Sequence, residues 1–313
     1  MRFSFTDDQR AFAEGLREML ARECPLSLVR GTWDDGSGHS PALWSRLDEM
    51  GVLSMLVPEA DGGMGGTMVD AVLLFQELGR AGVPGPVIEH MIAAPWTGMT
   101  AVTTGPVTTW LDGEPYVAHA ATARAILTPA GVLYDFVADP VDGVDGGRRL
   151  ATVGGGTTAA LSDLPLDLLR DQLSVATAAF LIGLGERMID IAGEYARQRE
   201  QFGKPIGAFQ AVKHLLANAL LKVEFAKAPT YRAAWSVSAG ADTAARDVSM
   251  AKVMANEAAY VASRAAMQVH GGIGYTWEAD LQLLMKKAWA LSRAHGDTRT
   301  HRRRVAAVVL HRS

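Results

Sequence analysis

Residues 166–203 carry the pattern that most constrains the fold of this chain. The segment LDLLRDQLSVATAAFLIGLGERMIDIAGEYARQREQFG places apolar side chains at helical spacing over roughly nine turns. Helices in globular proteins average about 11 to 12 residues, so a helix of this length has to span a whole bundle. Similar patterns cover about residues 209–238, 242–269 and 277–294, with short connections between them. Long helices joined by short connections predict an antiparallel bundle of the four-helix type.

Helix signals also occupy the N-terminal part of the chain. Thr6 and Gln9 have the spacing of a capping box, so a helix is expected to begin between them. Ser40 followed by Pro41 predicts the start of a second helix that ends near Gly51, and a third helix is expected from about residue 67 to residue 80. The intervening segment VPEADGGMGG is interpreted as a tight turn rather than a phosphate-binding loop. It has neither a preceding strand nor the Gly-x-Gly-x-x-Gly spacing.

The composition changes between about residues 82 and 164, where Val, Thr, Gly and Pro become frequent. Segments such as PVTTWL, AILTP and VLYDFVA are short, β-branched and bounded by turn residues, which is typical of strands. The chain is therefore predicted to be mostly α-helical with three parts. These are an N-terminal helical domain (1–90), a reduced β-rich middle domain (91–165) and a C-terminal helical bundle (166–313).

Charge and cysteine content exclude several classes of function. The net charge is -4, with 30 Lys and Arg against 34 Asp and Glu, so there is no basic field to hold a nucleic acid. Cys24 is the only cysteine, which excludes an internal disulfide and any cysteine-cluster metal site. No apolar run approaches the length of about 18 residues that a membrane span needs. A cytoplasmic protein with no metal, no nucleic-acid partner and no membrane span is expected.

The segment LSRAHGDTRTHRRR, residues 291–304, concentrates His, Asp and Arg. Gly296 stands where a helix C-terminus favours glycine, and Asp297 stands where the next helix favours an N-cap. We interpret the segment as a connection between two helices with solvated arginines. A catalytic pair of His295 and Asp297 is less favoured because no nucleophile lies nearby in the sequence, and a nucleic-acid arm is less favoured still.

Two further segments are more specific than composition can explain. They are YARQREQFGKPIGAFQAVKH, residues 195–214, and MQVHGGIGYTWEADLQLLMKKA, residues 267–288. Together they resemble the C-terminal signatures of the acyl-CoA dehydrogenase family. LWSRLDEMGVLSMLVPEADGGMGG and FQELGRAGVPGP resemble the opening helical domain of the same family. The resemblance covers nearly the whole chain, and it is strongest from about residue 166 onward and weakest in the middle region.

The resemblance implies a helical N-terminal domain, a β-domain and a C-terminal bundle that hold FAD at a subunit interface. In the family, the bundle of one subunit reaches the adenylate end of the neighbouring subunit's cofactor. The residues here that match those positions are Arg199, Gln201, Phe202, Gln210, Gln268, Gly271, Gly272 and Gly274. An arginine fork and closely approaching backbone amides are suited to a pyrophosphate.

The chain also departs from the family pattern at the catalytic positions. Alignment from GGIGY without a gap places the usual catalytic glutamate at His295. A second position used by some members falls on Leu173, beside Asp171 and Gln172, and holds no glutamate either. The middle region is short for the family. It has no counterpart of the Thr-Glu-Pro, Gly-Ser-Asp and Trp-Ile-Thr segments that line the flavin ring.

These matches and departures together resemble the small, non-catalytic subunit of heterotetrameric α2β2 acyl-CoA dehydrogenases of steroid-degrading actinobacteria. A larger catalytic subunit would supply the glutamate and the flavin pocket, and this chain would complete the FAD site. The assembly would convert an acyl-CoA to a 2-enoyl-CoA in steroid or cholesterol catabolism and pass electrons to an electron-transfer flavoprotein or a similar acceptor. Two alternatives stay open: a self-sufficient homo-oligomer with His295 or Asp171 as the base, and a helical scaffold without flavin.

Overall fold

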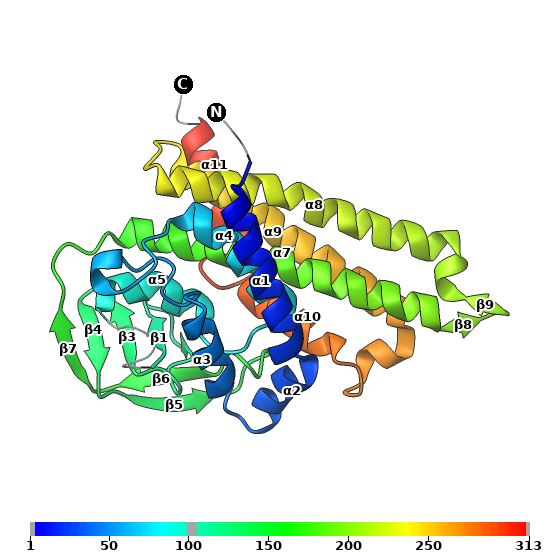
Figure 1. Cartoon of the computed structure of the whole chain (residues 1–313), viewed down its shortest axis with the longest axis horizontal. Helices are drawn as coiled ribbons and strands as arrows, with labels where there is room; N and C mark the ends of the chain where they lie inside the picture. The colour runs from blue at the N-terminus through cyan, green and yellow to red at the C-terminus, as the bar shows by residue number, and fades with distance from the viewer. Residues whose placement is uncertain (1–3, 99–104, 311–313) are drawn as a thin grey trace. The chain divides into compact units, whose positions relative to one another are not determined.

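The computed structural model describes residues 4–98 and 105–310. The chain divides into two compact units (Figure 1). Unit 1 comprises Met1–Leu74 and Val83–Leu173, and unit 2 comprises Phe75–Gly82 and Ser174–Ser313. Two helices, α4 (Met68–Ala81) and α7 (Leu166–Gln198), begin in unit 1 and continue into unit 2. The described residues are mostly helical with short strands in the middle, which confirms the predicted fold class, whereas the predicted division at residues 90 and 165 stays a prediction.

The helices of the N-terminal part begin where the capping signals indicated. The Thr6 side chain accepts from the Gln9 amide and the Thr6 amide donates to the Gln9 side chain, which confirms the capping box. Ser40 caps the helix that begins at Pro41 by accepting from the Leu43 amide at 3.3 Å. The helices are α1 (Asp7–Glu23), α2 (Leu26–Asp34), α3 (Pro41–Glu49), the 3-10 turn η1 (Glu59–Asp61), α4 (Met68–Ala81) and α5 (Val87–Thr97).

Two of these helices, α2 and α5, were missed by the sequence interpretation. Every residue of α5 from Val87 to Ala94 is buried, so the helix has no polar face and shows no amphipathic period. The change of composition at residue 82 was therefore read as the start of the strand-rich region, whereas the first strand among the described residues begins at Val107. A fully buried helix of this kind cannot be distinguished from a strand by periodicity alone.

The glycine-rich loop after α3 is a tight turn, as predicted. The amides of Gly62, Gly63, Gly65 and Gly66 all donate to backbone carbonyls between residues 55 and 59. A Cβ atom at Gly63 would lie 2.2 Å from the Val57 carbonyl oxygen, which explains why only glycine fits there. Because its amides are already used within the loop, this segment offers no cradle for a phosphate group.

Two small sheets form the rest of unit 1. One has the order β1-β3-β4-β7, with β1 parallel to β3 and the other pairs antiparallel, and the other has the order β2-β6-β5. Their core contains Val117, Ala120, Ile126, Leu133 and Ala151. The strands are β1 (Val107–Thr109), β2 (Val117–Ala118), β3 (Ala125–Thr128), β4 (Gly131–Tyr134), β5 (Val137–Val141), β6 (Leu150–Gly154) and β7 (Thr157–Ala160).

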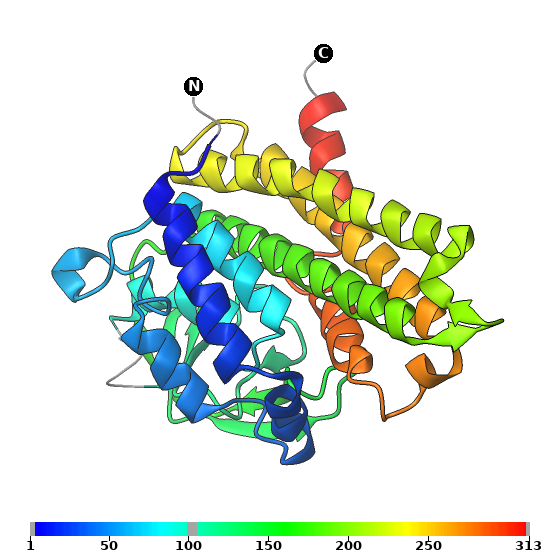
Figure 2. The same ribbon diagram turned by 45° about the vertical axis from the view of Figure 1, so that its right-hand side comes forward.

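Unit 2 is built on three long helices that run side by side (Figures 1 and 2). These are α7 (Leu166–Gln198), α8 (Gln210–Ser238) and α9 (Ala244–His270), and α8 continues through Pro229. A short hairpin, β8 (Glu200–Gln201) with β9 (Lys204–Pro205), projects from the end of α7 (Figure 1). The remaining elements are the 3-10 turns η2 (Ile206–Ala208) and η3 (Gly271–Tyr275) and the helices α10 (Leu281–Leu291) and α11 (Thr298–Leu310).

Two glycines bring the backbones of α4 and α7 into direct contact within unit 2. A Cβ atom at Gly79 would lie 2.1 Å from the Phe180 carbonyl oxygen. A Cβ atom at Gly183 would lie 1.9 Å from the Gln76 carbonyl oxygen. Since each glycine faces the backbone of the other helix, the two helices cross at a separation that no larger residue permits.

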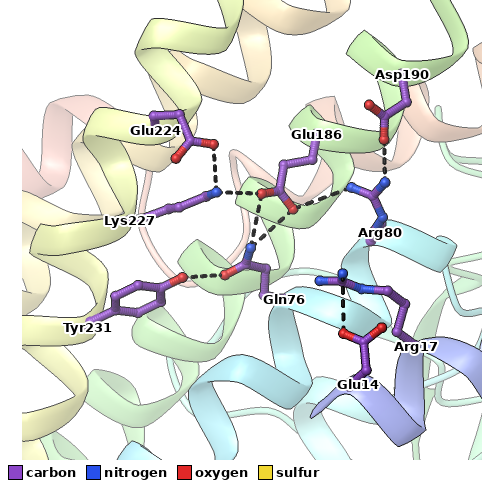
Figure 3. Close-up of polar contacts among 9 residues, drawn as sticks. All are labelled: Glu14, Arg17, Gln76, Arg80, Glu186, Asp190, Glu224, Lys227 and Tyr231. Atoms are coloured by element: carbon purple, nitrogen blue, oxygen red, sulfur yellow. Dashed lines mark hydrogen bonds and ion pairs between the residues drawn. The ribbon is translucent and has the colours of Figure 1, made fainter. Parts of the chain in front are cut away.

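A half-buried polar cluster joins the same two helices to α8 (Figure 3). Glu186 lies at its centre and binds Lys227 at 2.7 Å, Arg80 at 3.8 Å and the Gln76 amide at 3.0 Å. The Tyr231 hydroxyl donates to the Gln76 side-chain oxygen Oε1 at 2.7 Å. Burial, together with the nearby Glu186 carboxylate, raises the pKa of Tyr231 to about 12. The hydroxyl therefore stays protonated and keeps donating at physiological pH.

None of the helices formed by residues 4–98 and 105–310 combines the length and the hydrophobicity that a bilayer-spanning helix needs.

Candidate functional site

The hairpin after α7 carries two of the predicted site residues, Gln201 and Phe202. Its strands pair Glu200 with Pro205 and Gln201 with Lys204, which leaves Phe202 and Gly203 as a two-residue turn. Both turn residues have positive φ, 53° and 76°, as the right-handed twist of a tight hairpin requires. Phe202 is 93% exposed, and its ring meets the ring of Phe209 edge to face at 6.2 Å. The turn therefore presents an aromatic side chain and Gln201 to the outside of unit 2.

A groove of about 340 Å³ lies at the base of this hairpin. Gln201 and Phe202 of the hairpin and Gln268 of α9 all line it, although 67 positions separate Gln201 from Gln268 in the chain. Its other lining residues are apolar and come from η2, α8 and the end of α9: Ile206, Phe209, Ala211, Val212, Leu215 and Val269. The groove thus has an apolar floor with amide side chains at its edge, which suits a flat heterocycle with polar edges.

The glycines of the second signature form a turn at the end of α9. Gly271 has a φ of 61° and donates its amide to the Met267 carbonyl, which ends the helix. Cβ atoms at Gly271 or Gly272 would meet no atom within 4 Å, so the backbone there is open to approach. Gly274 is different, because a Cβ atom there would lie 3.1 Å from the His270 side chain. Gly274 therefore allows the turn to fold against the helix end, while Gly271 and Gly272 expose their backbone.

The other two predicted residues lie on the same segments as the groove. Arg199 is exposed and directly precedes the hairpin, and its carbonyl accepts from the Ile206 amide at 2.8 Å. Gln210 is exposed and begins α8, whose N-cap residue Phe209 provides no side-chain hydrogen bond to the helix. An uncapped helix N-terminus and an exposed guanidinium both favour negative charge. All eight predicted residues therefore lie in unit 2, and three of them line one groove.

Residues 292–297 connect α10 and α11, as predicted, but α10 ends at Leu291 with Ser292 as its C-cap, so Gly296 is not the cap of that helix. His295 and Gly296 have φ values of 54° and 93°, and Asp297 accepts from the Thr300 amide at 2.8 Å as the N-cap of α11. This hydrogen bond lowers the pKa of Asp297 below its usual value. Arg302 and Arg303 on α11 are exposed. The interpretation of this segment as a helix connection is confirmed.

A buried polar network that the sequence interpretation missed holds this connection. The Lys252 ammonium on α9 is fully buried and donates to Asn256 at 2.9 Å and to the carbonyls of Leu291 and Gly296, each at 3.2 Å. His301 donates from Nε2 to the His295 carbonyl at 2.9 Å, and burial lowers the pKa of His301 to about 4. The signal in the sequence is the i, i+4 pair of Lys252 and Asn256 on an otherwise alanine-rich helix face.

The two candidate base positions lie in different units. His295 is half-buried in unit 2, and its carbonyl accepts from Ser174 at 3.2 Å as well as from His301. Asp171 and Leu173 are both buried in unit 1, with exposed fractions of 7% and 2%. Among the described residues, no group of three or more His, Cys, Asp or Glu side chains is arranged to hold a metal ion.

Comparisons with known proteins agree with the resemblance read from the sequence. Residues 6–102 match the model of the acyl-CoA dehydrogenase N-terminal domain, and residues 171–310 match that of the C-terminal domain. Acyl-CoA dehydrogenase IpdE2 of Mycolicibacterium smegmatis is 31% identical, covering 97% of this chain and 99% of its own length. IpdE2 of Mycobacterium tuberculosis is 31% identical, covering 90% of this chain and 91% of its own length.

Solved structures share the fold at lower identity. A variant of the Tcur3481-Tcur3483 steroid ACAD superposes with a TM-score of 0.86 at 19% identity, covering 97% of this chain and 98% of that chain. The ChsE4-ChsE5 complex from Mycobacterium tuberculosis superposes with a TM-score of 0.83 at 22% identity and covers 100% of both chains. With relatives that match it over nearly its full length, this chain belongs to the acyl-CoA dehydrogenase family.

Proposed function

We propose that this chain is the smaller, non-catalytic subunit of a heteromeric acyl-CoA dehydrogenase and that it completes the FAD site of a larger catalytic subunit. Members of the family are FAD-dependent oxidoreductases. The observation that carries the proposal is the groove of unit 2, where Gln201, Phe202 and Gln268 meet although they come from two distant segments. These are positions that the family uses to reach the cofactor of a neighbouring subunit.

The residues present fit the adenosine-diphosphate end of FAD. The apolar floor formed by Phe209, Val212 and Leu215 is suited to an adenine ring, and amide side chains at the edge can hydrogen-bond its nitrogens. Arg199 is suited to the phosphates, and at Gly272 a ligand can approach the backbone without a Cβ atom in the way. The hairpin tip with Phe202 exposed is suited to reaching across a subunit boundary.

The residues at the two candidate base positions also support a catalytic base that is supplied by the larger subunit. At the family's usual glutamate position this chain has His295, whose carbonyl is fixed by Ser174 and His301 in a helix connection. At the second position it has Leu173, which is apolar and buried. We therefore infer that the larger subunit supplies the carboxylate that removes the α-proton, and that this chain contributes binding and orientation of the cofactor.

Bound FAD supplies the acceptor for the hydride that leaves the β-carbon when an acyl-CoA becomes a 2-enoyl-CoA. The contribution of this chain is to hold the adenylate end in one place through Arg199, Gln201 and Gln268, so that the cofactor does not move when the substrate binds. One structural relative is named as a steroid ACAD and another as the ChsE4-ChsE5 complex, which supports a steroid acyl-CoA substrate and an assembly of two different chains. A further structural relative is named as an electron-transferring flavoprotein, which supports such a protein as the electron acceptor.

Co-expression with candidate larger subunits of the family tests the proposal. The expected product is a yellow complex with equal amounts of the two chains, whereas this chain alone is expected to be colourless. A yellow and active protein from this chain alone would instead support the self-sufficient homo-oligomer with His295 or Asp171 as the base. A colourless complex that is inactive with every acyl-CoA would support the scaffold without flavin.

A substitution of Arg199 tests the cofactor contact directly. In the purified complex, Arg199→Ala is expected to raise the dissociation constant of FAD by roughly tenfold, because a charge-assisted hydrogen bond to phosphate is lost. Arg303→Ala removes an exposed arginine from α11, away from the groove, and is the matched control, for which the dissociation constant should stay unchanged. Equal flavin retention by the wild-type and Arg199→Ala complexes would remove Arg199 from the site.

A further inference from the structure

We propose that Tyr195 and His270 form a positioning pair that fixes the distance between the two cofactor-binding segments. Their rings stack with centroids 4.4 Å apart and planes only 17° from parallel. Tyr195 lies in the last turn of α7, just before the hairpin, and His270 is the last residue of α9, just before the glycine turn. The inference rests on the proposed function, since it concerns the two segments assigned there to FAD.

Tyr195 is joined through a backbone hydrogen bond to Arg199, the residue that precedes the hairpin of Gln201 and Phe202. The Tyr195 carbonyl accepts from the Arg199 amide at 2.8 Å, and the Arg199 carbonyl accepts from the Ile206 amide at 2.8 Å. A Cβ atom at Gly207 would lie 3.0 Å from the Ala196 carbonyl oxygen, so the returning chain packs against the same turn of α7. Because of these contacts, the hairpin moves together with the last turn of α7.

His270 has the same relation to the glycine turn. It is 9% exposed, and its Nδ1 donates to the Ala266 carbonyl at 2.8 Å, which fixes the orientation of the ring. Gly274 folds back onto it, since a Cβ atom there would lie 3.1 Å from the His270 Cβ. The positions of the glycine turn and of Gln268, two residues before His270, therefore depend on the position of His270.

The stacked rings of Tyr195 and His270 connect the end of α7, which holds the hairpin, to the end of α9, which holds the glycine turn. Gln201 and Gln268 line opposite segments of one groove, so a shift of α7 relative to α9 would change the distance between them. Ligand affinity depends on such distances because a binding site that is not preorganised has to be ordered when the ligand arrives. Neither ring is assigned a contact with the cofactor, so Tyr195 and His270 act through the segments that they hold.

Amide hydrogen exchange in the full chain without any partner tests the positioning role by itself. Tyr195→Leu removes the ring and is expected to increase exchange about tenfold in residues 199–206 and 271–276, because loss of packing lowers the free energy of local opening. Tyr195→Phe keeps the ring and should leave both segments protected as in the wild type. Tyr231→Leu is the matched control: it makes the same change on α8, 21 residues after Gln210 and so about 31 Å further along the helix axis.

The affinity of the complex for FAD tests the consequence for binding. Tyr195→Leu and His270→Leu are each expected to raise the dissociation constant of FAD by roughly tenfold, since the two segments lose their fixed separation. Tyr195→Phe should restore the wild-type value, and Tyr231→Leu should leave it unchanged. If Tyr195→Leu does not fold, Tyr195→Met replaces it, because the long flexible methionine side chain adapts to an irregular gap without providing a ring.

The two arms separate this inference from the function on which it rests. If the wild-type complex binds no FAD, the proposed function fails, while hydrogen exchange in the chain alone still decides whether the stack positions the two segments. If the wild-type complex binds FAD and Tyr195→Leu binds it equally well, the positioning role is refuted. A loss of affinity in Tyr195→Phe as large as in Tyr195→Leu would also overturn it, because it would show that the hydroxyl and not the stacked ring is required.

Discussion

Gly296 is the residue on which the connection between α10 and α11 depends most. Its φ of 93° is accessible to glycine at no cost, and a Cβ atom there would lie 2.5 Å from His301 Nε2. The preceding His295 also has a positive φ, 54°, which costs a non-glycine residue about 1 to 2 kcal/mol. The hydrogen bond from His301 to the His295 carbonyl offsets part of that cost.

Gly296→Ala is therefore expected to lower the free energy of unfolding by about 3 kcal/mol, combining backbone strain with displacement of a buried ring. Gly240→Ala is the matched control, because Gly240 also has a positive φ, 59°, but a Cβ atom there would meet nothing within 4 Å. Gly240→Ala should lower the free energy of unfolding by only about 1 kcal/mol. Urea denaturation followed by circular dichroism measures both values. Equal losses in the two variants would show that the His301 contact does not matter.

Most elements with a polar face or a capping signal could be predicted from the sequence, although the short helix α2, which has exposed residues but no side-chain N-cap, was missed. The capping box at Thr6 and the Ser40 N-cap located two helix starts correctly. The buried helix α5 carries neither signal and was read as part of the strand region. The contact between α4 and α7 was also invisible, because a glycine within a helical pattern does not reveal which other helix lies against it.

The crossing of α4 and α7 leads to opposite expectations for two glycines of the same helix. Gly183→Ala should lower the free energy of unfolding by about 3 kcal/mol or more, because its Cβ atom would overlap the Gln76 carbonyl at 1.9 Å. Gly193→Ala should raise it by up to about 1 kcal/mol, since alanine favours the helix and the new Cβ atom has only Arg197 within reach, at 3.7 Å. Thermal and urea unfolding of both variants check the prediction. Stabilisation by both substitutions would mean that the helices do not cross at Gly183.

At the scale of the whole molecule, the residues of the candidate site could be selected only through the family resemblance. Periodicity placed Gln201 and Gln268 at the ends of two helices, but it could not show that those ends border one groove. The network around Lys252 was missed for a related reason, since burial of a charged side chain depends on elements 39 and 44 residues away. Local patterns specify helices well, and long-range contacts much less well.

Buried histidines predict how the stability of the whole chain depends on pH. Burial lowers the pKa of His301 to about 4 and that of His90 to about 3. Both folded values lie below the unfolded value of about 6.5, so protonation favours the unfolded state. The stabilising effect of each neutral ring is complete above about pH 6.5 and is lost as the pH falls toward the folded pKa. Protonation of each histidine should therefore lower the free energy of unfolding by about 2 kcal/mol between pH 7 and pH 5.

The variant His301→Gln isolates the contribution of His301. It lacks the titrating group, so its loss of stability from pH 7 to pH 5 should be smaller than that of the wild type by about 2 kcal/mol. Urea denaturation at the two pH values measures the difference, and comparison within each protein removes the effect of the substitution at neutral pH. An unchanged pH dependence would contradict the assignment to His301 and leave His90 as the main contributor.

The burial of Lys252 gives the chain an internal chemical probe. Its side chain is fully enclosed and its ammonium hydrogen-bonds to Asn256 and to the carbonyls of Leu291 and Gly296, whereas lysines such as Lys213 and Lys222 are exposed. Reagents that acylate amines will modify the exposed lysines at once and can reach Lys252 only when α9 separates from α10. Mass spectrometry can measure how fast Lys252 becomes acylated. This rate reports how often this end of the bundle opens.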